Sequence, residues 1–126
     1  MIFVSGGSFS EKEKFVFERL CLDDKKVCFG KEVLLENIFE FDVIFDLQEL
    51  IKRYIDVSNL KEILTEKAEF EIVVCDDVGL GIVPVLKEER DFREMVGRIG
   101  CAFAKKADTV VYVTMGIPKI IKGKLL

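Results

Sequence analysis

The sequence predicts an α/β fold of three layers, in which helices cover both faces of a mostly parallel sheet. Short apolar runs rich in β-branched residues, such as EIVVC at residues 71–75 and TVVYVT at 109–114, are typical of strands that are buried on both faces. Amphipathic segments alternate with these runs, which is the pattern of parallel β-α-β units. With 126 residues, half of them hydrophobic, the chain is expected to form a single domain over residues 1–126.

The first half of the chain is expected to hold three strands, each followed by a helical or polar segment. The strands are expected at residues 2–4, 26–30 and 41–47. Helices are expected at about 11–22, 48–55 and 58–67. Ser58 is expected to be the N-cap of the last of these helices. Residues 32–40 fit either a short helix or an irregular connection.

The second half continues the alternation and contains the clearest helix of the chain, at residues 88–107. Its apolar face is formed by Phe92, Met95, Val96, Ile99 and Phe103. Strands are expected on either side of it, at residues 71–75 and 109–114, with a short final strand at 119–122. A turn at residues 116–118 separates the last two strands.

The first twenty residues contain an arrangement that binds anions: a strand, a turn of small residues and a helix N-terminus. Free backbone N–H groups and the helix dipole converge at such a place. The phosphate-loop pattern G-x-x-x-x-G-K-[ST], laid on Gly6, finds Lys12 in place. A nucleotide or another phosphate ligand is therefore expected to contact this turn. The expected contact residues are Gly6, Gly7, Ser8, Ser10 and Lys12.

Two positions of the turn depart from that pattern. Glu11 stands where the second glycine belongs, and Glu13 stands where the magnesium-binding hydroxyl belongs. Glu11 is expected to place a carboxylate where the backbone should approach the phosphates, and to repel them. Glu13 could still hold a metal through oxygen. Alternatively, both glutamates are simply first-turn residues that the helix dipole favours.

An acidic residue ends the strand expected at residues 41–47. Open α/β sheets bind their ligands at the carboxyl ends of the strands, which is where Asp46 falls. In phosphate-loop proteins an acid at such a place positions magnesium. Asp46 and Glu13 are therefore the expected metal ligands. The alternative for Asp46 is a strand-end turn or a helix cap.

A second unusual stretch, DDVGLGIVP, follows the strand at residues 71–75. Its adjacent carboxylates, Asp76 and Asp77, could bind a metal or a ribose hydroxyl. Gly79 and Gly81 shape the loop behind them, at the same edge of the sheet. The alternative is a structural loop in which the glycines supply positive φ and Asp76 caps a turn.

The composition excludes several classes of function. The chain has no histidine, which excludes histidine acid–base catalysis, histidine metal ligands and a phosphohistidine or nucleotidyl-histidine intermediate. A net charge of −4 gives no footprint for nucleic acid or for an anionic membrane. No apolar run approaches the roughly 20 residues that span a bilayer, and no signal-peptide pattern opens the chain, so a cytoplasmic location is expected.

The remaining compositional features are the cysteines and the choice of polar residues. Cys21, Cys28, Cys75 and Cys101 are scattered and form no C-x-x-C pair, so they are expected to be reduced and free of metal. Lys and Glu are abundant, whereas Asn and Gln are few, which is the bias reported for hyperthermophiles.

Three stretches in the second half form an ordered pattern: VVCDDVGLGIVP, ERDFREMVGRI and ADTVVYVTMGIPKIIKG. Together they resemble the second half of the bifunctional adenosylcobinamide kinase/adenosylcobinamide-phosphate guanylyltransferase family of cobalamin biosynthesis. In that family the loop typically reads N-E-V-G-x-G-[IV]-V-P, followed by F-R-x-x-x-G-R and an A-D-x-V strand with a G-I-P turn. The opening MIFVSGG is also similar to the family's M-I-L-V-T-G-G. The matching residues are Val78, Gly79, Gly81, Val83, Pro84, Phe92, Arg93, Gly97, Arg98, Ala107, Asp108 and Gly116.

This resemblance implies a phosphate-loop NTPase fold of the RecA-like type, ATP or GTP with Mg²⁺ as ligands, and a trimeric homo-oligomer. Asp46 lies where the family's magnesium-associated acid would fall. Family members have G-K-S where this chain has Glu11, Lys12 and Glu13, so only Lys12 carries over as a phosphate contact. The family also has a long segment after its second strand, with the histidine that becomes guanylylated. Here that segment is short and no histidine exists, so the guanylyltransferase mechanism cannot operate.

The leading interpretation is a diverged family member with a degenerate phosphate-binding loop, without guanylyltransferase activity but with weak nucleotide binding. One alternative is an active adenosylcobinamide kinase in which Lys12, Asp46 and Glu13 act with nucleotide and magnesium. Another is a non-catalytic oligomeric interaction protein that keeps only the fold and its assembly surface.

Overall fold

A computed structural model describes residues 1–79, 81 and 83–125 of the chain, in which six strands form one sheet of order β2-β3-β4-β1-β5-β6. The strands are β1 (Ile2–Gly6), β2 (Val27–Phe29), β3 (Val43–Phe45), β4 (Ile72–Asp76), β5 (Thr109–Thr114) and β6 (Ile117–Lys122). Neighbouring strands are parallel except for β5 and β6, which pair antiparallel. The predicted, mostly parallel sheet is confirmed.

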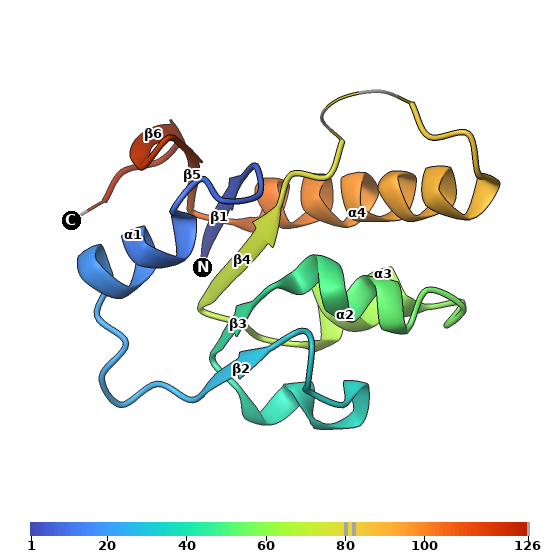
Figure 1. Ribbon diagram of the computed structural model, residues 1–126. Helices are drawn as coiled ribbons and strands as arrows, with labels where there is room; N and C mark the ends of the chain where they lie inside the picture. Colours follow the sequence, from blue (N-terminus) through green and yellow to red (C-terminus); the bar gives the residue numbers. More distant parts are fainter. Residues whose placement is uncertain (80, 82, 126) are drawn as a thin grey trace.

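Helices cover both faces of this sheet (Figure 1). They are α1 (Lys12–Arg19), α2 (Leu47–Arg53), α3 (Leu60–Glu62) and α4 (Lys87–Lys106), with a 3₁₀ helix at Leu35–Glu40 and a π-helical turn at Ile63–Lys67. Among the described helices, α1 lies on one face, whereas α2, α3 and α4 lie on the other. None of the described helices is long and apolar enough to cross a membrane.

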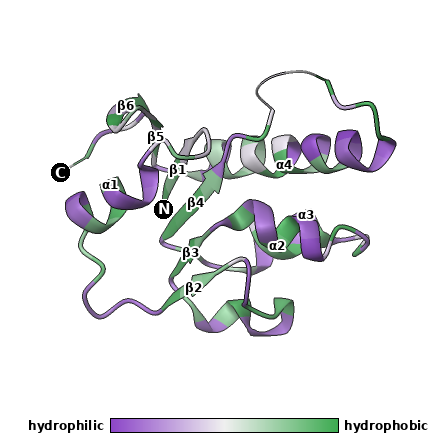
Figure 2. Ribbon diagram, viewed as in Figure 1, coloured by the Kyte–Doolittle hydropathy of each residue, from purple (hydrophilic) through white to green (hydrophobic). Residues whose placement is uncertain are grey.

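The strands contribute side chains to two separate hydrophobic clusters, one on each face of the sheet. In β1, Phe3 packs into the cluster with α2 and α4, and its ring stacks on Phe103 at a centroid distance of 5.9 Å. The next residue, Val4, packs into the other cluster with Phe15 and Val16 of α1. Successive side chains of a strand point to opposite faces, which explains the doubly apolar strands of Figure 2. The carboxyl end of β1 lies between β4 and β5 and has a hydrophobic cluster on each face.

Some predicted boundaries are wrong for identifiable reasons. Helix α1 ends at Arg19, and not near residue 22, because Leu20 is extended. Ser58 is not an N-cap: Asn59 holds that position and makes no side-chain capping bond. Residues 32–40, which fitted either a short helix or an irregular connection, contain the 3₁₀ helix Leu35–Glu40. Strand β6 starts earlier than predicted and includes Pro118, which an edge strand tolerates.

Candidate functional site

The turn after β1 joins a strand to a helix N-terminus, which is the arrangement found in anion-binding loops. Gly6 lies between Asp76 of β4 and Val113 of β5. A Cβ at Gly6 would collide with the carbonyl oxygen of Val113 and lie 2.7 Å from Ser10 Oγ, so only glycine fits there. The turn is closed by a hydrogen bond of 3.2 Å from the Ser10 N–H to the Gly7 carbonyl. Helix α1 then starts at the carboxyl edge of the sheet, where its first N–H groups have no intrahelical acceptor.

Glu11 has a backbone conformation that favours glycine. Its φ of 68° and ψ of 27° lie in the left-handed region. The expectation that its carboxylate occupies the phosphate space is wrong, because the side chain turns toward the connection between β5 and β6. There its Oε1 lies 2.7 Å from the position of a Cβ on Gly116. It lines a small pocket of about 150 Å³ with Lys14 and Arg19.

Lys12 lies at the base of the turn and is almost fully buried, with 1% of its surface exposed. Its Nζ donates a hydrogen bond of 3.1 Å to the Gly7 carbonyl and forms an ion pair with Asp76. The Glu13 carboxylate is also close, 3.5 Å from Nζ. A buried ammonium is tolerated only when it is paired, so these contacts hold Lys12 in place. A bound phosphate would have to share this ammonium with Asp76.

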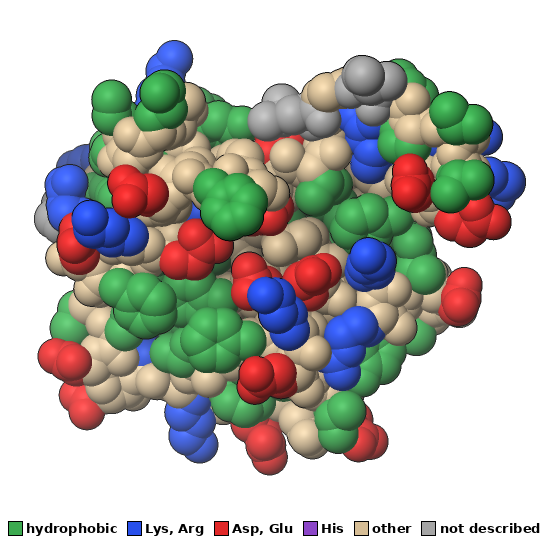
Figure 3. Space-filling view, in the orientation of Figure 1, with side chains coloured by type: hydrophobic (Ala, Val, Ile, Leu, Met, Phe, Trp, Pro, Cys, Tyr) green, Lys and Arg blue, Asp and Glu red, His purple; other side chains and the backbone are tan. Residues whose placement is uncertain are grey.

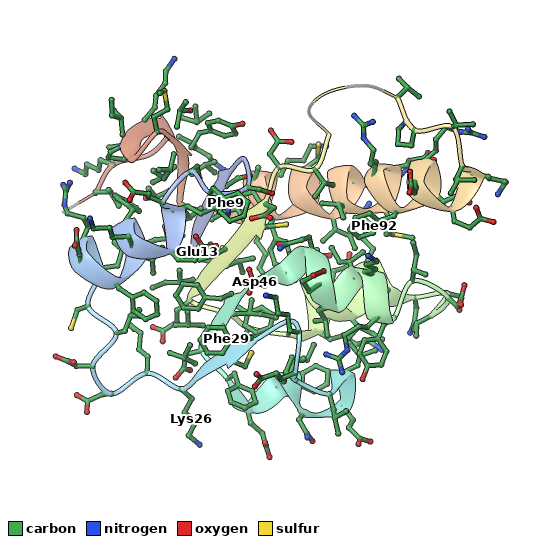
Figure 4. All side chains as sticks on the ribbon, viewed as in Figure 1. Phe9, Glu13, Lys26, Phe29, Asp46 and Phe92 are labelled. Carbon is green, nitrogen blue, oxygen red and sulfur yellow. The ribbon has the colours of Figure 1, made fainter. Side chains whose placement is uncertain are left out.

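Three carboxylates from separate elements meet beside Lys12: Glu13 of α1, Asp46 after β3 and Asp76 at the end of β4. One oxygen of each lies within 4.8 Å of the other two. Acidic side chains gather at the centre of the face shown in Figure 3, and Glu13 and Asp46 lie there between Phe9 and Phe29 in Figure 4. We call these three residues the acid cluster. Its oxygen ligands are of the kind that Mg²⁺ prefers.

The backbone at Asp46 explains why its side chain is available. Asp46 occupies the N-cap position of α2 with a left-handed φ of 55°, and its side chain makes no capping hydrogen bond. The alternative function of a helix cap is therefore wrong for this residue. The acid cluster and Lys12 together carry a formal charge of −2. One divalent cation would neutralise that charge.

The two adjacent acids after β4 are separated by the structure. Asp76 belongs to the site: besides Lys12, it accepts a hydrogen bond of 3.2 Å from the Ser8 hydroxyl. Asp77 instead stabilises its own loop, since it accepts bonds from the Tyr112 hydroxyl at 3.0 Å and from the Gly79 N–H at 3.3 Å. Burial and the bond to Asp77 raise the pKa of Tyr112. The turn cap expected at Asp76 is therefore formed by Asp77.

The rest of that loop follows the structural alternative. Gly81 has a φ of 96°, a conformation that favours glycine. The Gly79 carbonyl accepts a hydrogen bond of 2.6 Å from Arg93 of α4, which ties the loop to the helix. Leu80 and Ile82, which also belong to the predicted loop, lie outside the described residues.

Sequence reasoning missed one residue that supports the site. Gln48 is buried in the first turn of α2, and its Oε1 accepts a hydrogen bond of 2.9 Å from the backbone N–H of Asp76. It thereby joins the helix that follows Asp46 to the strand that carries Asp76. An amide two residues after a strand-end acid was the available signal, but nothing in the sequence indicated its partner.

A family model described as cobinamide kinase / cobinamide phosphate guanyltransferase matches residues 32–121. A search among curated proteins found no match. The matched span includes Asp46 and Asp76 and begins after the turn that holds Lys12, so the turn is characterised by its geometry alone. The match covers more than two thirds of the chain and agrees with the fold, which is that of the phosphate-loop NTPases. The chain therefore belongs to the cobinamide kinase / cobinamide phosphate guanyltransferase family.

Proposed function

We propose that the chain is a diverged member of this family that binds a nucleoside triphosphate together with Mg²⁺ and does not transfer guanylate. The observation that carries this proposal is the convergence of Lys12 with the acid cluster at one edge of the sheet. The ammonium suits a phosphate, and the carboxylates suit the metal that phosphates bring with them. Gly6, Gly7, Ser8 and Ser10 would supply the backbone and hydroxyl contacts of the turn.

Charge makes the proposed binding dependent on magnesium. Without a divalent cation, a triphosphate would meet a cluster of formal charge −2. At an effective dielectric constant of about 20, each pair of like unit charges about 5 Å apart is repelled by ~3 kcal/mol. Mg²⁺ removes this repulsion by binding oxygens of both the protein and the ligand. The buried pair of Lys12 with Asp76 also competes with phosphate, which supports weak binding.

The absence of histidine supports the loss of the second family activity. None of the 126 residues is a histidine, so the chain has no side chain to carry a guanylyl-histidine intermediate. Kinase activity has no such obstacle. Because Lys12, Glu13 and Asp46 lie together, adenosylcobinamide kinase activity is the second candidate. Its assay is phosphate transfer from labelled ATP to adenosylcobinamide.

Assembly is a third property that we infer only from the family resemblance. A homo-oligomer, trimeric by that resemblance, would bury the exposed apolar side chains of the edge strand β6. Ile117 and Ile121 are 69% and 59% exposed there. Light scattering coupled to size-exclusion chromatography tests it, and a monomer would contradict it. The cytoplasmic location and the thermophilic source also stay predictions.

Calorimetric titration with ATP and with GTP tests the leading proposal. Binding is expected in the presence of Mg²⁺ and not in the presence of a chelator. Asp46→Asn should weaken the magnesium-dependent binding at least tenfold, the effect of one lost charge pair of about 1.4 kcal/mol or more. Asp91→Asn, an exposed acid of α4 outside the site, is the matched control and should change nothing. Equal binding with and without Mg²⁺ would contradict the proposed role of the acid cluster.

A further inference from the structure

We propose that a recess between the turn after β1 and the end of β5 receives the purine base of the bound nucleotide, and that the Phe9 ring stacks on this base. This inference rests on the proposed function, because it assigns the nucleoside end of the same ligand. It adds a second subsite, on the opposite side of the turn from the acid cluster.

The recess is formed by two segments that are distant in the sequence. Residues 7–10 line one side of it and residues 112–115 line the other, around a volume of about 240 Å³. Because β1 lies between β4 and β5, the turn after β1 separates this recess from Asp76. A ligand with its phosphates at Lys12 and its metal at the acid cluster would therefore extend its nucleoside across the turn toward β5.

The two sides of the recess carry apolar side chains on unfavourable backbone. The Phe9 side chain is fully exposed, and its φ is 61°. Met115 on the opposite segment is 86% exposed, with a φ of 51°. A left-handed conformation is costly for residues other than glycine and tends to persist where a ligand is clamped. Figure 4 shows Phe9 on the same face as Glu13 and Asp46. An exposed aromatic ring beside a phosphate site suits base stacking.

A polar group in the same place also lacks a partner. Ser10 lines the recess, and its Oγ is buried with no hydrogen-bond partner among the described residues. Buried hydroxyls are nearly always hydrogen-bonded, so this one is available to an oxygen or nitrogen of a ligand. Tyr112, on the other side, is held in place by its hydrogen bond to Asp77. The recess thus combines Tyr112, which a hydrogen bond holds in place, with the exposed ring of Phe9 and the Ser10 hydroxyl, which has no partner among the described residues.

Comparing a nucleotide with a ligand that has no base separates this subsite from the phosphate site. Calorimetry would measure the affinities of ATP and of inorganic tripolyphosphate, both with Mg²⁺, for the wild type and for Phe9→Ala. The variant should bind ATP roughly fivefold to a hundredfold more weakly, the range for loss of one base–aromatic stack, and should bind tripolyphosphate unchanged. Phe9→Trp should restore ATP binding. Phe39→Ala, a half-exposed phenylalanine of the 3₁₀ helix, is the control.

The outcomes separate the two proposals. Equal weakening of both ligands, or no weakening of either, would overturn the assignment of Phe9. Tripolyphosphate binding as tight as ATP binding in the wild type would overturn the base subsite alone. If neither ligand binds the wild type, the proposed function fails together with this inference.

Discussion

Replacing Lys12 by methionine removes the cation that pairs with Asp76 and lies 3.5 Å from the Glu13 carboxylate. Methionine keeps the apolar stem that is buried beneath the turn, so the change is chiefly one of charge. Three carboxylates, with oxygens within 4.8 Å of one another, then lose the counter-ion that they have among the described residues. Each pair repels by about 3–4 kcal/mol at an effective dielectric constant of about 20.

The measurable destabilisation is smaller than that sum, because the side chains of Asp76 and Glu13 are 18% and 39% exposed and water screens them. Removing one partner of a buried ion pair costs about 3–5 kcal/mol, and partial exposure lowers this range to about 2–4 kcal/mol. Lys12→Met should therefore lower the free energy of unfolding by that amount. Urea denaturation followed by circular dichroism measures it. Lys87→Met, which breaks an exposed pair with Asp91, should lower the free energy of unfolding much less than Lys12→Met does.

Magnesium gives the same experiment a second readout. A divalent cation that binds the folded cluster stabilises it by mass action, and it should do so more strongly once Lys12 no longer competes. Lys12→Met should therefore regain stability with Mg²⁺ while it loses nucleotide binding. A loss of stability no larger than that of Lys87→Met, or equal stabilisation of the variant and the wild type by Mg²⁺, would contradict this prediction.

Three further outcomes are expected. Glu11→Gly should raise the free energy of unfolding by about 1 kcal/mol in urea denaturation, because glycine adopts the left-handed backbone without strain; a loss of stability would contradict this. Incubation with labelled GTP followed by mass spectrometry should show no protein-bound guanylate, because no histidine can accept it, and a stable adduct would be the contrary result. At neutral pH a thiol reagent should label the exposed Cys21 and Cys101 quickly and the buried Cys28 and Cys75 slowly. The reason is that burial raises the pKa of both buried thiols to about 12. After unfolding, the reagent should titrate four thiols, and fewer would indicate a disulfide or a bound metal.

Hydrophobic pattern was enough to predict most of the fold. Strand β5 occupies the predicted residues, and β4 and α4 differ from their predictions by about one residue, because long or doubly apolar segments leave little choice of structure. The helix expected at residues 58–67 was harder to predict in detail. Ser58 does not cap it, and the segment forms the short helix α3 followed by a π-helical turn that packs against α4. Contacts with other elements determine the conformation of such a segment, and the local sequence pattern does not.

The candidate site was predictable only as separate parts. Glu13, Asp46 and Lys12 followed from a motif and from strand ends, yet their proximity depends on the strand order, which places β4 between β1 and β3. For the same reason sequence reasoning could not divide the roles of Asp76 and Asp77. Adjacent residues at a strand end point in different directions, so one meets Lys12 and the other meets Tyr112. The side chain of Glu11 escaped prediction because its direction follows from a positive φ.

Binding of Mn²⁺, a paramagnetic substitute for Mg²⁺, tests the joint metal and nucleotide site most directly. Electron paramagnetic resonance measures the free ion during titrations of the wild type and of Asp46→Asn, each with and without ATP. ATP should tighten Mn²⁺ binding to the wild type beyond the affinity of ATP itself for the metal, and Asp46→Asn should remove this gain. If protein and ATP together bind no more Mn²⁺ than the two do separately, the acid cluster and Lys12 do not form a metal–nucleotide site.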